Sequence, residues 1–327
     1  MRFVVIGAGA IGGVVGGFLA RAGREVVLVA RGAQAAAIDE RGLRVETPGG
    51  AFTVQVPVVE QPARVAWRAD DVAMLAVKTQ DAAVALGDLA AAATVPVVCL
   101  TNGIETERLA LRQLAEVYAA CVMLPATYLS PGVVQAWAAP SPGAIDVGRY
   151  PDDVHGRDAR AVAIAAALSE AGFVCRTPDD IMRWKRGKLL SNLANSAEAM
   201  CGPAARLSPL ADRARREAVA CFAAAGLSHT SDEEYAARNV ATRAQPIAGA
   251  TRGGGSTWQS LARGQSLETD YLNGEIVLLG RLHGVATPVN AMLQRVVGDA
   301  ARDGLAPGAM TIDELTARID RAPVDRA

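Results

Sequence analysis

The stretch that decides the fold is Phe3-Val4-Val5-Ile6-Gly7-Ala8-Gly9-Ala10-Ile11-Gly12, an apolar run followed directly by a glycine-rich turn. The apolar run predicts a buried strand, and the glycines fit the pattern G-x-G-x-x-G at the start of a helix. In this pattern the first glycine permits a tight turn, the second lets a pyrophosphate approach the backbone, and the third lets the helix pack on the strand. Because the pattern stands between a strand and a helix, we favour a dinucleotide site over a packing turn without cofactor.

Further apolar runs of strand length follow along the first half of the chain: Glu25–Val29, Val72–Val77, Val95–Leu100 and Val117–Met123. They alternate with helix-length segments, which indicates βαβ units and a parallel sheet. Leu43–Val45 and Phe52–Val58 predict an inserted hairpin that turns at Gly49-Gly50. Two later runs, Ala144–Val147 and Gly172–Cys175, are expected to close the sheet.

After about Pro178 the pattern changes to helix periodicity with little alternation of β-branched residues. The clearest long helix is expected over Leu261–His283, and the tail after Met310 is polar. We therefore predict an α/β fold, with an N-terminal Rossmann-like doubly wound sheet in residues 1–179. An all-helical C-terminal domain is expected in residues 180–327 for substrate binding and dimerisation.

The composition is that of a globular protein with two domains. The chain has 327 residues, 51% hydrophobic and 20% charged, and 33 basic against 34 acidic residues leave a net charge of −1. A nearly neutral chain has no overall basic field for nucleic acid or an anionic membrane. Glycines interrupt the apolar N-terminus, so we do not interpret it as a signal peptide.

The cysteines and histidines favour a reduced, metal-free protein. Five cysteines are widely spaced without a C-x-x-C pair, so reduced core thiols in a cytoplasmic protein are expected. The histidines His155, His229 and His283 are isolated, and no His/Cys cluster has the spacing of metal ligands. We therefore expect no metal site.

Arg31 follows the second predicted strand, at the position where an NAD site carries Asp or Glu for the ribose 2′-hydroxyl. A guanidinium suits a 2′-phosphate, so NADPH is preferred over NADH. The alternative is a solvated loop arginine.

Other polar residues stand where chemistry is expected. Lys78 and Asn102 each follow an apolar strand, and ligands of open α/β sheets bind beyond the carboxyl ends of strands. Lys188 and Asn192 are four residues apart, so they share one helix face, and Ser196 extends that face by one turn. The alternatives are ordinary loop residues and a solvated helix face.

With these residues in view, the sequence resembles the ketopantoate reductase (2-dehydropantoate 2-reductase) family over nearly the whole chain. The resemblance rests on the glycine fingerprint, Arg31, Val77-Lys78, Thr101-Asn102-Gly103, the run Trp184…Lys188-x-x-x-Asn192, and Leu267-Glu268-Thr269-Asp270-Tyr271-Leu272-Asn273-Gly274. It implies NADPH-dependent reduction of 2-dehydropantoate to pantoate, the chemistry of pantothenate biosynthesis.

The resemblance also implies roles for single residues. Lys188 matches the lysine that acts as general acid, and Asn102 matches the asparagine at the nicotinamide and the substrate. Lys78 matches a lysine on the cofactor side. The remaining matches are substrate-binding positions: Asn192, Ser196, Ser256 and Glu268.

The chain departs from the family near the substrate. Where the family often has a second asparagine one turn after the first, this chain has Ser196, with Asn195 one residue earlier. The family segment Ser-Ser-Met-x-x-Asp reads Gly255-Ser256-Thr257-Trp258-Gln259-Ser260 here, so the acid is missing. These departures leave open a reductase of another 2-oxo acid.

Two further alternatives stay open. A non-catalytic NADP-binding sensor is disfavoured by the Lys188, Asn192 and Glu268 set. A hydroxyacid or polyol-phosphate dehydrogenase is conceivable because basic clusters at Arg183–Lys188 and Arg213–Arg216 can hold a phosphate. The partners expected are a small 2-oxo acid and a second copy of the chain.

Overall fold

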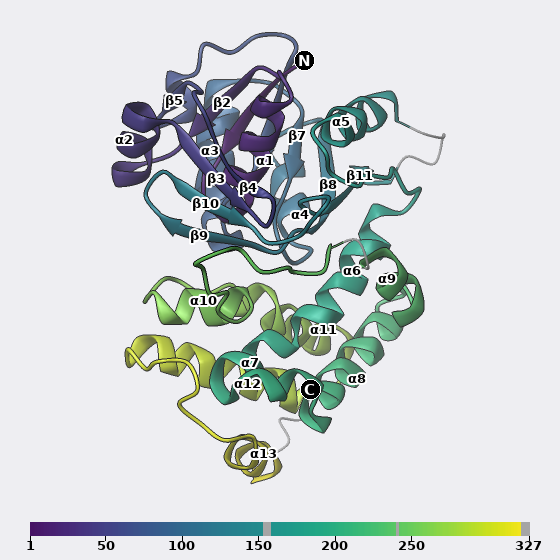
Figure 1. Cartoon of the computed structure of the whole chain (residues 1–327). Coiled ribbons are helices and arrows are strands. Elements are labelled where there is room, and N and C mark those ends of the chain that lie inside the picture. Colours follow the sequence, from purple (N-terminus) through teal and green to yellow (C-terminus); the bar gives the residue numbers. More distant parts are fainter. Residues whose placement is uncertain (153–157, 240–241, 322–327) are drawn as a thin grey trace. The chain divides into compact units, whose positions relative to one another are not determined.

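A computed structural model describes residues 1–152, 158–239 and 242–321, so His155 lies outside the described residues. The chain forms two compact units (Figure 1). Unit 1 comprises Met1–Lys185 and Asp232–Thr251, and unit 2 comprises Arg186–Ser231 and Arg252–Ala327.

Unit 1 is built on a sheet of seven strands in the order β11-β8-β7-β6-β1-β2-β5. The strands are β1 (Arg2–Ile6), β2 (Val26–Val29), β5 (Val58–Val59), β6 (Asp71–Leu75), β7 (Val97–Cys99), β8 (Val117–Met123) and β11 (Ala144–Tyr150). All neighbours pair in parallel except β11, which runs antiparallel to β8 at the edge. The predicted parallel α/β sheet is thus confirmed.

Helices of unit 1 connect these strands: α1 (Ala10–Arg21), α2 (Gly32–Arg41), α3 (Thr79–Ala92), α4 (Thr106–Leu111) and α5 (Ala159–Glu170), with a 3-10 turn η1 at Pro62–Arg64. The predicted hairpin is confirmed as β3 (Leu43–Thr47) and β4 (Gly50–Val54). It joins β10 (Val133–Ala136) and β9 (Ala126–Ser130) in a second sheet of order β4-β3-β10-β9.

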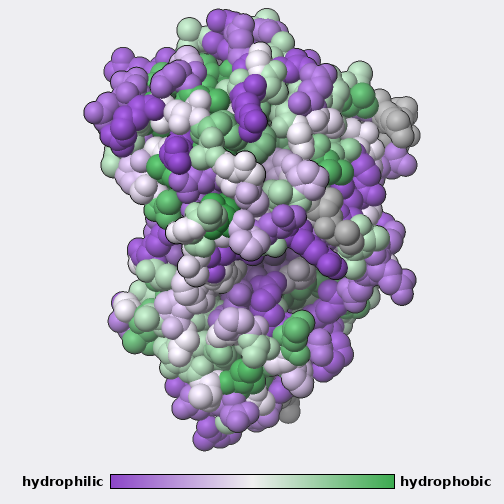
Figure 2. Space-filling model, viewed as in Figure 1, coloured by the Kyte–Doolittle hydropathy of each residue, from purple (hydrophilic) through white to green (hydrophobic). Residues whose placement is uncertain are grey.

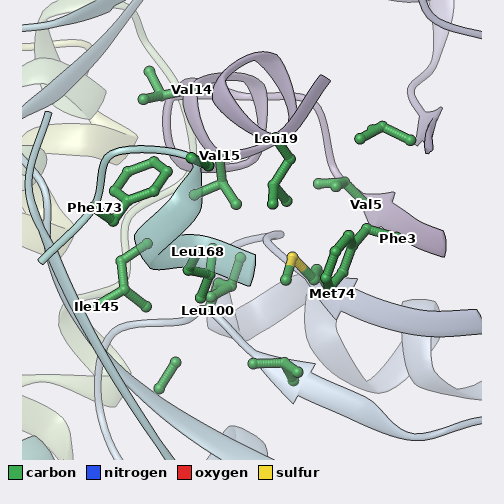
Figure 3. Packing of buried hydrophobic residues seen from close by; sticks show 14 of the residues in the cluster. Phe3, Val5, Val14, Val15, Leu19, Met74, Leu100, Ile145, Leu168 and Phe173 are labelled. Carbon is green, nitrogen blue, oxygen red and sulfur yellow. The ribbon is translucent and has the colours of Figure 1, made fainter. Parts of the chain in front are cut away.

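Two apolar cores cover the two faces of the large sheet, because its strands are buried and apolar on both sides. The first core holds residues of β1, α1, α5 and the second sheet, including Phe3, Leu19 and Phe173 (Figure 3). The second core packs Ala82, Leu86 and Leu89 of α3 on the opposite face. The ends of the strands are therefore held at fixed positions along one edge.

Unit 2 is helical, as the change of periodicity predicts. Its elements are α7 (Ala194–Cys201), α8 (Pro209–Ala224), α10 (Ser256–Ala262), α11 (Asn273–His283), α12 (Pro288–Arg302) and α13 (Ile312–Arg321), with 3-10 turns η2 (Pro203–Leu207) and η4 (Thr269–Tyr271). The polar tail is anchored, because Leu315 and Ile319 of α13 are buried.

The prediction of one continuous helix over Leu261–His283 is wrong. The segment is divided into α10, η4 and α11, and the side chains of Leu278 and Leu282 are 44% and 65% exposed. Leu272, Ile276 and Leu279 are buried instead, which sets the buried face of α11 on a different side of the helix. Asn273 at the start of α11 donates hydrogen bonds to the Leu193 carbonyl and to Asn290 Oδ1, and the helical pattern of the preceding segment ends there.

One other detail differs from expectation. Gly172–Cys175 forms a single bridge between Val174 and Ala144 rather than a strand. Unit 1 extends along the chain to Lys185, which lies within α6 (Ile181–Asn192). The segment Asp232–Thr251, with α9 (Asp232–Asn239), belongs to unit 1, where Arg238 donates to the buried Asp146 at 2.5 and 3.0 Å.

On the face drawn in Figure 2, hydrophobic residues are scattered among hydrophilic ones. None of the helices in the described part of the chain combines the length and the apolar composition that crossing a bilayer requires.

Candidate active site

The predicted cofactor residues of unit 1 lie in a row along one edge of the sheet. Strands β7, β6, β1 and β2 are consecutive neighbours and all parallel, so their carboxyl ends meet at the same edge. Asn102 follows β7, Lys78 follows β6, Gly7 follows β1 and Arg31 follows β2. The topology therefore brings together four positions that are spread over 95 residues of sequence, from 7 to 102.

The glycine turn has the shape that a dinucleotide pyrophosphate requires. Gly7 has a φ of +100°, which favours glycine, and a Cβ at Gly12 would lie 2.0 Å from the Gly7 carbonyl oxygen and 2.9 Å from Ala76 Cβ. A Cβ at Gly9, the N-cap of α1, would meet no atom within 4 Å. Gly9 therefore leaves open space beside the amino end of a helix, where phosphate oxygens bind favourably. The residues present fit a dinucleotide.

Arg31 precedes α2 and is well exposed, with 69% of its side chain accessible. Its Nη2 lies 3.4 Å from Asp88 Oδ2, and Asp88 is 45% exposed. An exposed ion pair of this length contributes little, about 0–1 kcal/mol. The guanidinium can therefore exchange this partner for another anion at small cost.

The turn that carries Asn102 is held by two side chains that the sequence alone did not single out. Thr79 Oγ1 donates to the Asn102 carbonyl at 3.2 Å, and Lys185 Nζ donates to the Thr101 carbonyl at 3.1 Å. Lys185 also forms a buried ion pair with Glu107. Burial raises the pKa of Glu107, and the charge of Lys185 opposes that shift. In the sequence, Lys185 stands one turn before Lys188 and within the basic cluster Arg183–Lys188.

In unit 2, α6 carries Lys188 and Asn192, both half-buried. The predicted helix is confirmed, and the spacing of four residues places both on one face. Leu189, Leu190 and Leu193 are buried beside them. This helix face can therefore present an ammonium group and an amide group together. Hydrogen-bond donors placed in this way can polarise a carbonyl oxygen.

Ser196 lies in the interior of unit 2. It is 1% exposed, and its Oγ donates to Asn273 Oδ1 at 2.6 Å. Asn273 in turn donates to Asn290 Oδ1 at 2.9 Å, and Asn290 donates to Glu217 Oε2 at 2.8 Å. The hydroxyl of Ser196 is thus part of a buried network, and its direct contact with a substrate stays a prediction.

Ser256 and Glu268 stand at the ends of short elements. Ser256 is exposed at the start of α10, where its Oγ accepts a bond of 3.4 Å from Asn195 Nδ2. Glu268 is half-buried and precedes η4, in the break between α10 and α11. This break places Glu268 outside a regular helix, which the expected continuous helix did not anticipate.

A parallel sheet with a glycine fingerprint at its carboxyl edge is typical of α/β dinucleotide-binding proteins. Family models described as "Ketopantoate reductase PanE/ApbA" and "Ketopantoate reductase PanE/ApbA C terminal" match residues 3–152 and 180–301. The chain belongs to the ketopantoate reductase PanE/ApbA family, and it is an oxidoreductase of the 2-dehydropantoate 2-reductase type, which acts on a CH–OH group.

Relatives and solved structures agree with this family. The 2-dehydropantoate 2-reductase of Halobacterium salinarum is 32% identical, over 93% of this chain and 100% of its own length. A PanE/ApbA family ketopantoate reductase structure from Ralstonia eutropha JMP134 is 30% identical, with a TM-score of 0.77 over 93% of this chain and 99% of its own. D-mandelate dehydrogenase, solved with NADH and anilino(oxo)acetate, is 22% identical with a TM-score of 0.76 over 93% and 99%, and shares the fold.

Proposed function

We propose that the protein reduces a small 2-oxo acid with NADPH, with 2-dehydropantoate as the first candidate substrate. The observation that carries this proposal is the row of Asn102, Lys78, the Gly7–Gly12 turn and Arg31 along adjacent strand ends of unit 1. Unit 2 supplies the second set, with Lys188 and Asn192 on one helix face.

The residues of the chain have distinct tasks in this proposal. NADPH, when bound, supplies the hydride. Lys188 hydrogen-bonds the ketone oxygen, stabilises the negative charge that develops there and then gives up its proton. Asn102 orients the reacting groups, which reduces the entropic part of the barrier.

The other predicted residues bind substrate or cofactor. Asn192, Ser256 and Glu268 hold the substrate, and Glu268 accepts a bond from its hydroxyl. Lys78 contacts the cofactor. Ser196 acts from the interior, because its hydroxyl already bonds to Asn273 and so supports α7.

The preference for NADPH rests on Arg31. Its exposed guanidinium follows β2, and its 3.4 Å pair with Asp88 is weak enough to be exchanged for a 2′-phosphate. An NADH enzyme would carry a carboxylate at this position.

The substrate is the least constrained part of the proposal. Trp258 and Ser260 replace residues of the family pattern close to Ser256. These replacements favour testing other 2-oxo acids beside ketopantoate. We also propose a cytoplasmic protein, since the five cysteines are reduced thiols, and a homodimer formed through the helical unit.

NADPH oxidation against a panel of 2-oxo acids, including ketopantoate and phosphorylated compounds, tests this function. We expect turnover with at least one unphosphorylated 2-oxo acid. Binding of NADPH without oxidation in the presence of any member would instead indicate a sensor.

The variant Lys188→Ala is expected to lower kcat by orders of magnitude while the affinity for NADPH stays nearly unchanged. Lys188→Arg is the matched control, because arginine keeps the positive charge but does not readily release a proton. We expect it to retain substrate binding and lose turnover. Turnover of Lys188→Ala close to that of the wild type would exclude the general-acid role.

A further inference from the structure

The loop Gly253–Ser256 is held from one side by its own helix. A Cβ at Gly253 would lie 2.2 Å from Trp258 Cζ3, and a Cβ at Gly254 would lie 2.6 Å from Trp258 Cγ. The indole therefore occupies the space that side chains at these positions would need. Gln259 Nε2 also donates to the Gly254 carbonyl at 3.1 Å. The tryptophan that departs from the family pattern thus packs on the glycine run before Ser256.

The other side of this loop meets a buried carboxylate from α7. Glu198, 6% exposed, accepts bonds at Oε2 from the Gly255 backbone N–H at 3.1 Å and from Arg206 Nη1 at 2.9 Å. A Cβ at residue 255 would lie only 2.7 Å from the same Oε2. Glu198 therefore lies directly against the backbone beside Ser256, and a side chain at residue 255 would require the Glu198 carboxylate to shift.

Asn195 connects this ion pair to Ser256. Arg206 Nη1 donates to Asn195 Oδ1 at 2.5 Å, and Asn195 Nδ2 lies 3.4 Å from Ser256 Oγ. Because a guanidinium only donates, it selects the carbonyl oxygen of the amide and turns the NH₂ group toward Ser256. Ser256 Oγ accepts this bond, so its own hydrogen points elsewhere.

The charges around this loop favour an anion. Burial lowers the pKa of Arg252, and the nearby Glu198 opposes the shift while Arg206 adds to it. The charges of Glu198 and Arg206 thus both act on Arg252, and Arg206 is itself paired with Glu198. The local excess of one positive charge suits the carboxylate of a 2-oxo acid.

We propose that Asn195, Glu198 and Arg206 are positioning residues that orient the Ser256 hydroxyl to donate its hydrogen to the substrate carboxylate. The inference rests on the proposed function, in which Ser256 holds the 2-oxo acid. Asn195 supplies an amide one residue before Ser196, and Glu198 places a carboxylate beside the same loop.

The variant Asn195→Ala tests the orientation of the hydroxyl. It removes the NH₂ donor without adding a charge, so the Ser256 hydroxyl is no longer directed toward the substrate. We expect KM for the 2-oxo acid to rise up to about tenfold, as a weakened bond to a charged group implies, with KM for NADPH unchanged. Gln265→Ala, which removes an exposed amide of the same unit, is the control.

A double-mutant cycle completes the test. Ser256→Ala is expected to raise the same KM about tenfold, and Asn195→Ala/Ser256→Ala to match Ser256→Ala, because no hydroxyl is left to orient. An Asn195→Ala protein with wild-type KM, or a double variant whose effects multiply, overturns the inference alone. A wild type that turns over no 2-oxo acid overturns the proposed function, and this inference with it.

Discussion

The buried pair of Lys185 and Glu107 allows a quantitative test of how the Asn102 turn is held. In Lys185→Met an apolar side chain of similar length replaces the lysine side chain. Glu107, which is 0% exposed, then loses its counter-charge. The carboxylate then takes up a proton in the folded protein. Protonation of a group with an ordinary pKa of 4.5 costs about 1.4 kcal/mol per pH unit, or about 3 kcal/mol near neutrality.

We expect Lys185→Met to be less stable than the wild type by up to about 3 kcal/mol near neutral pH. This corresponds to about 6–12 °C in melting temperature for a unit of this size. The difference between the two proteins is smaller than the full cost of protonation, because burial raises the pKa of Glu107 in the wild type as well and destabilises it in the same way. Intrinsic fluorescence follows unit 1 selectively, since Trp67, Trp137 and Trp184 lie in it and only Trp258 lies in unit 2.

The pH dependence has a defined sign. Because the pKa of Glu107 in the folded variant lies above its unfolded value, its contribution to stability is fully present below about 4.5 and lost as pH rises. The deficit should therefore shrink as pH falls toward 5. The double variant Lys185→Met/Glu107→Gln, which leaves neither charge buried, should recover most of the stability. A deficit independent of pH, together with a double variant as unstable as the single one, would refute the reasoning.

Three further predictions concern the sheet of unit 1. Arg31→Asp should erode the preference for NADPH over NADH, measured as the ratio of kcat/KM values; an unchanged ratio would show that Arg31 does not contact the 2′-phosphate. Gly12→Ala should lower the melting temperature, because its Cβ meets the Gly7 carbonyl, whereas Gly9→Ala should preserve the melting temperature and weaken NADPH binding in calorimetry. Burial and the neighbouring Asp158 raise the pKa of Tyr118 to about 12, so the stability that this group contributes is present below pH 10 and lost above it. In a pH titration, the tyrosinate absorbance that appears only at the highest pH should be absent from Tyr118→Phe.

The sequence predicted the first unit well because its signals are local. A buried parallel strand requires a continuous apolar run, and a phosphate-binding turn requires glycine at three positions, so Phe3–Gly12 is legible without any tertiary information. The positions of Lys78 and Asn102 could also be predicted, since each directly follows an apolar run. The helix boundaries of the second unit were harder to predict, because amphipathic periodicity can continue across a break in a helix. The division of Leu261–His283 into α10, η4 and α11 shows this.

By itself, the sequence determined the strands of the sheet, the glycine turn and the helical spacing of Lys188 and Asn192, since each depends on neighbours a few residues apart. Only the tertiary structure decided which side chains meet across long separations. It buried Ser196 against Asn273 and joined Lys185 to Glu107, and it brought Asn195 to Ser256, which is 61 residues away. Such contacts depend on how elements pack. They are selected by burial and by hydrogen-bond geometry, and no local sequence pattern encodes either of these.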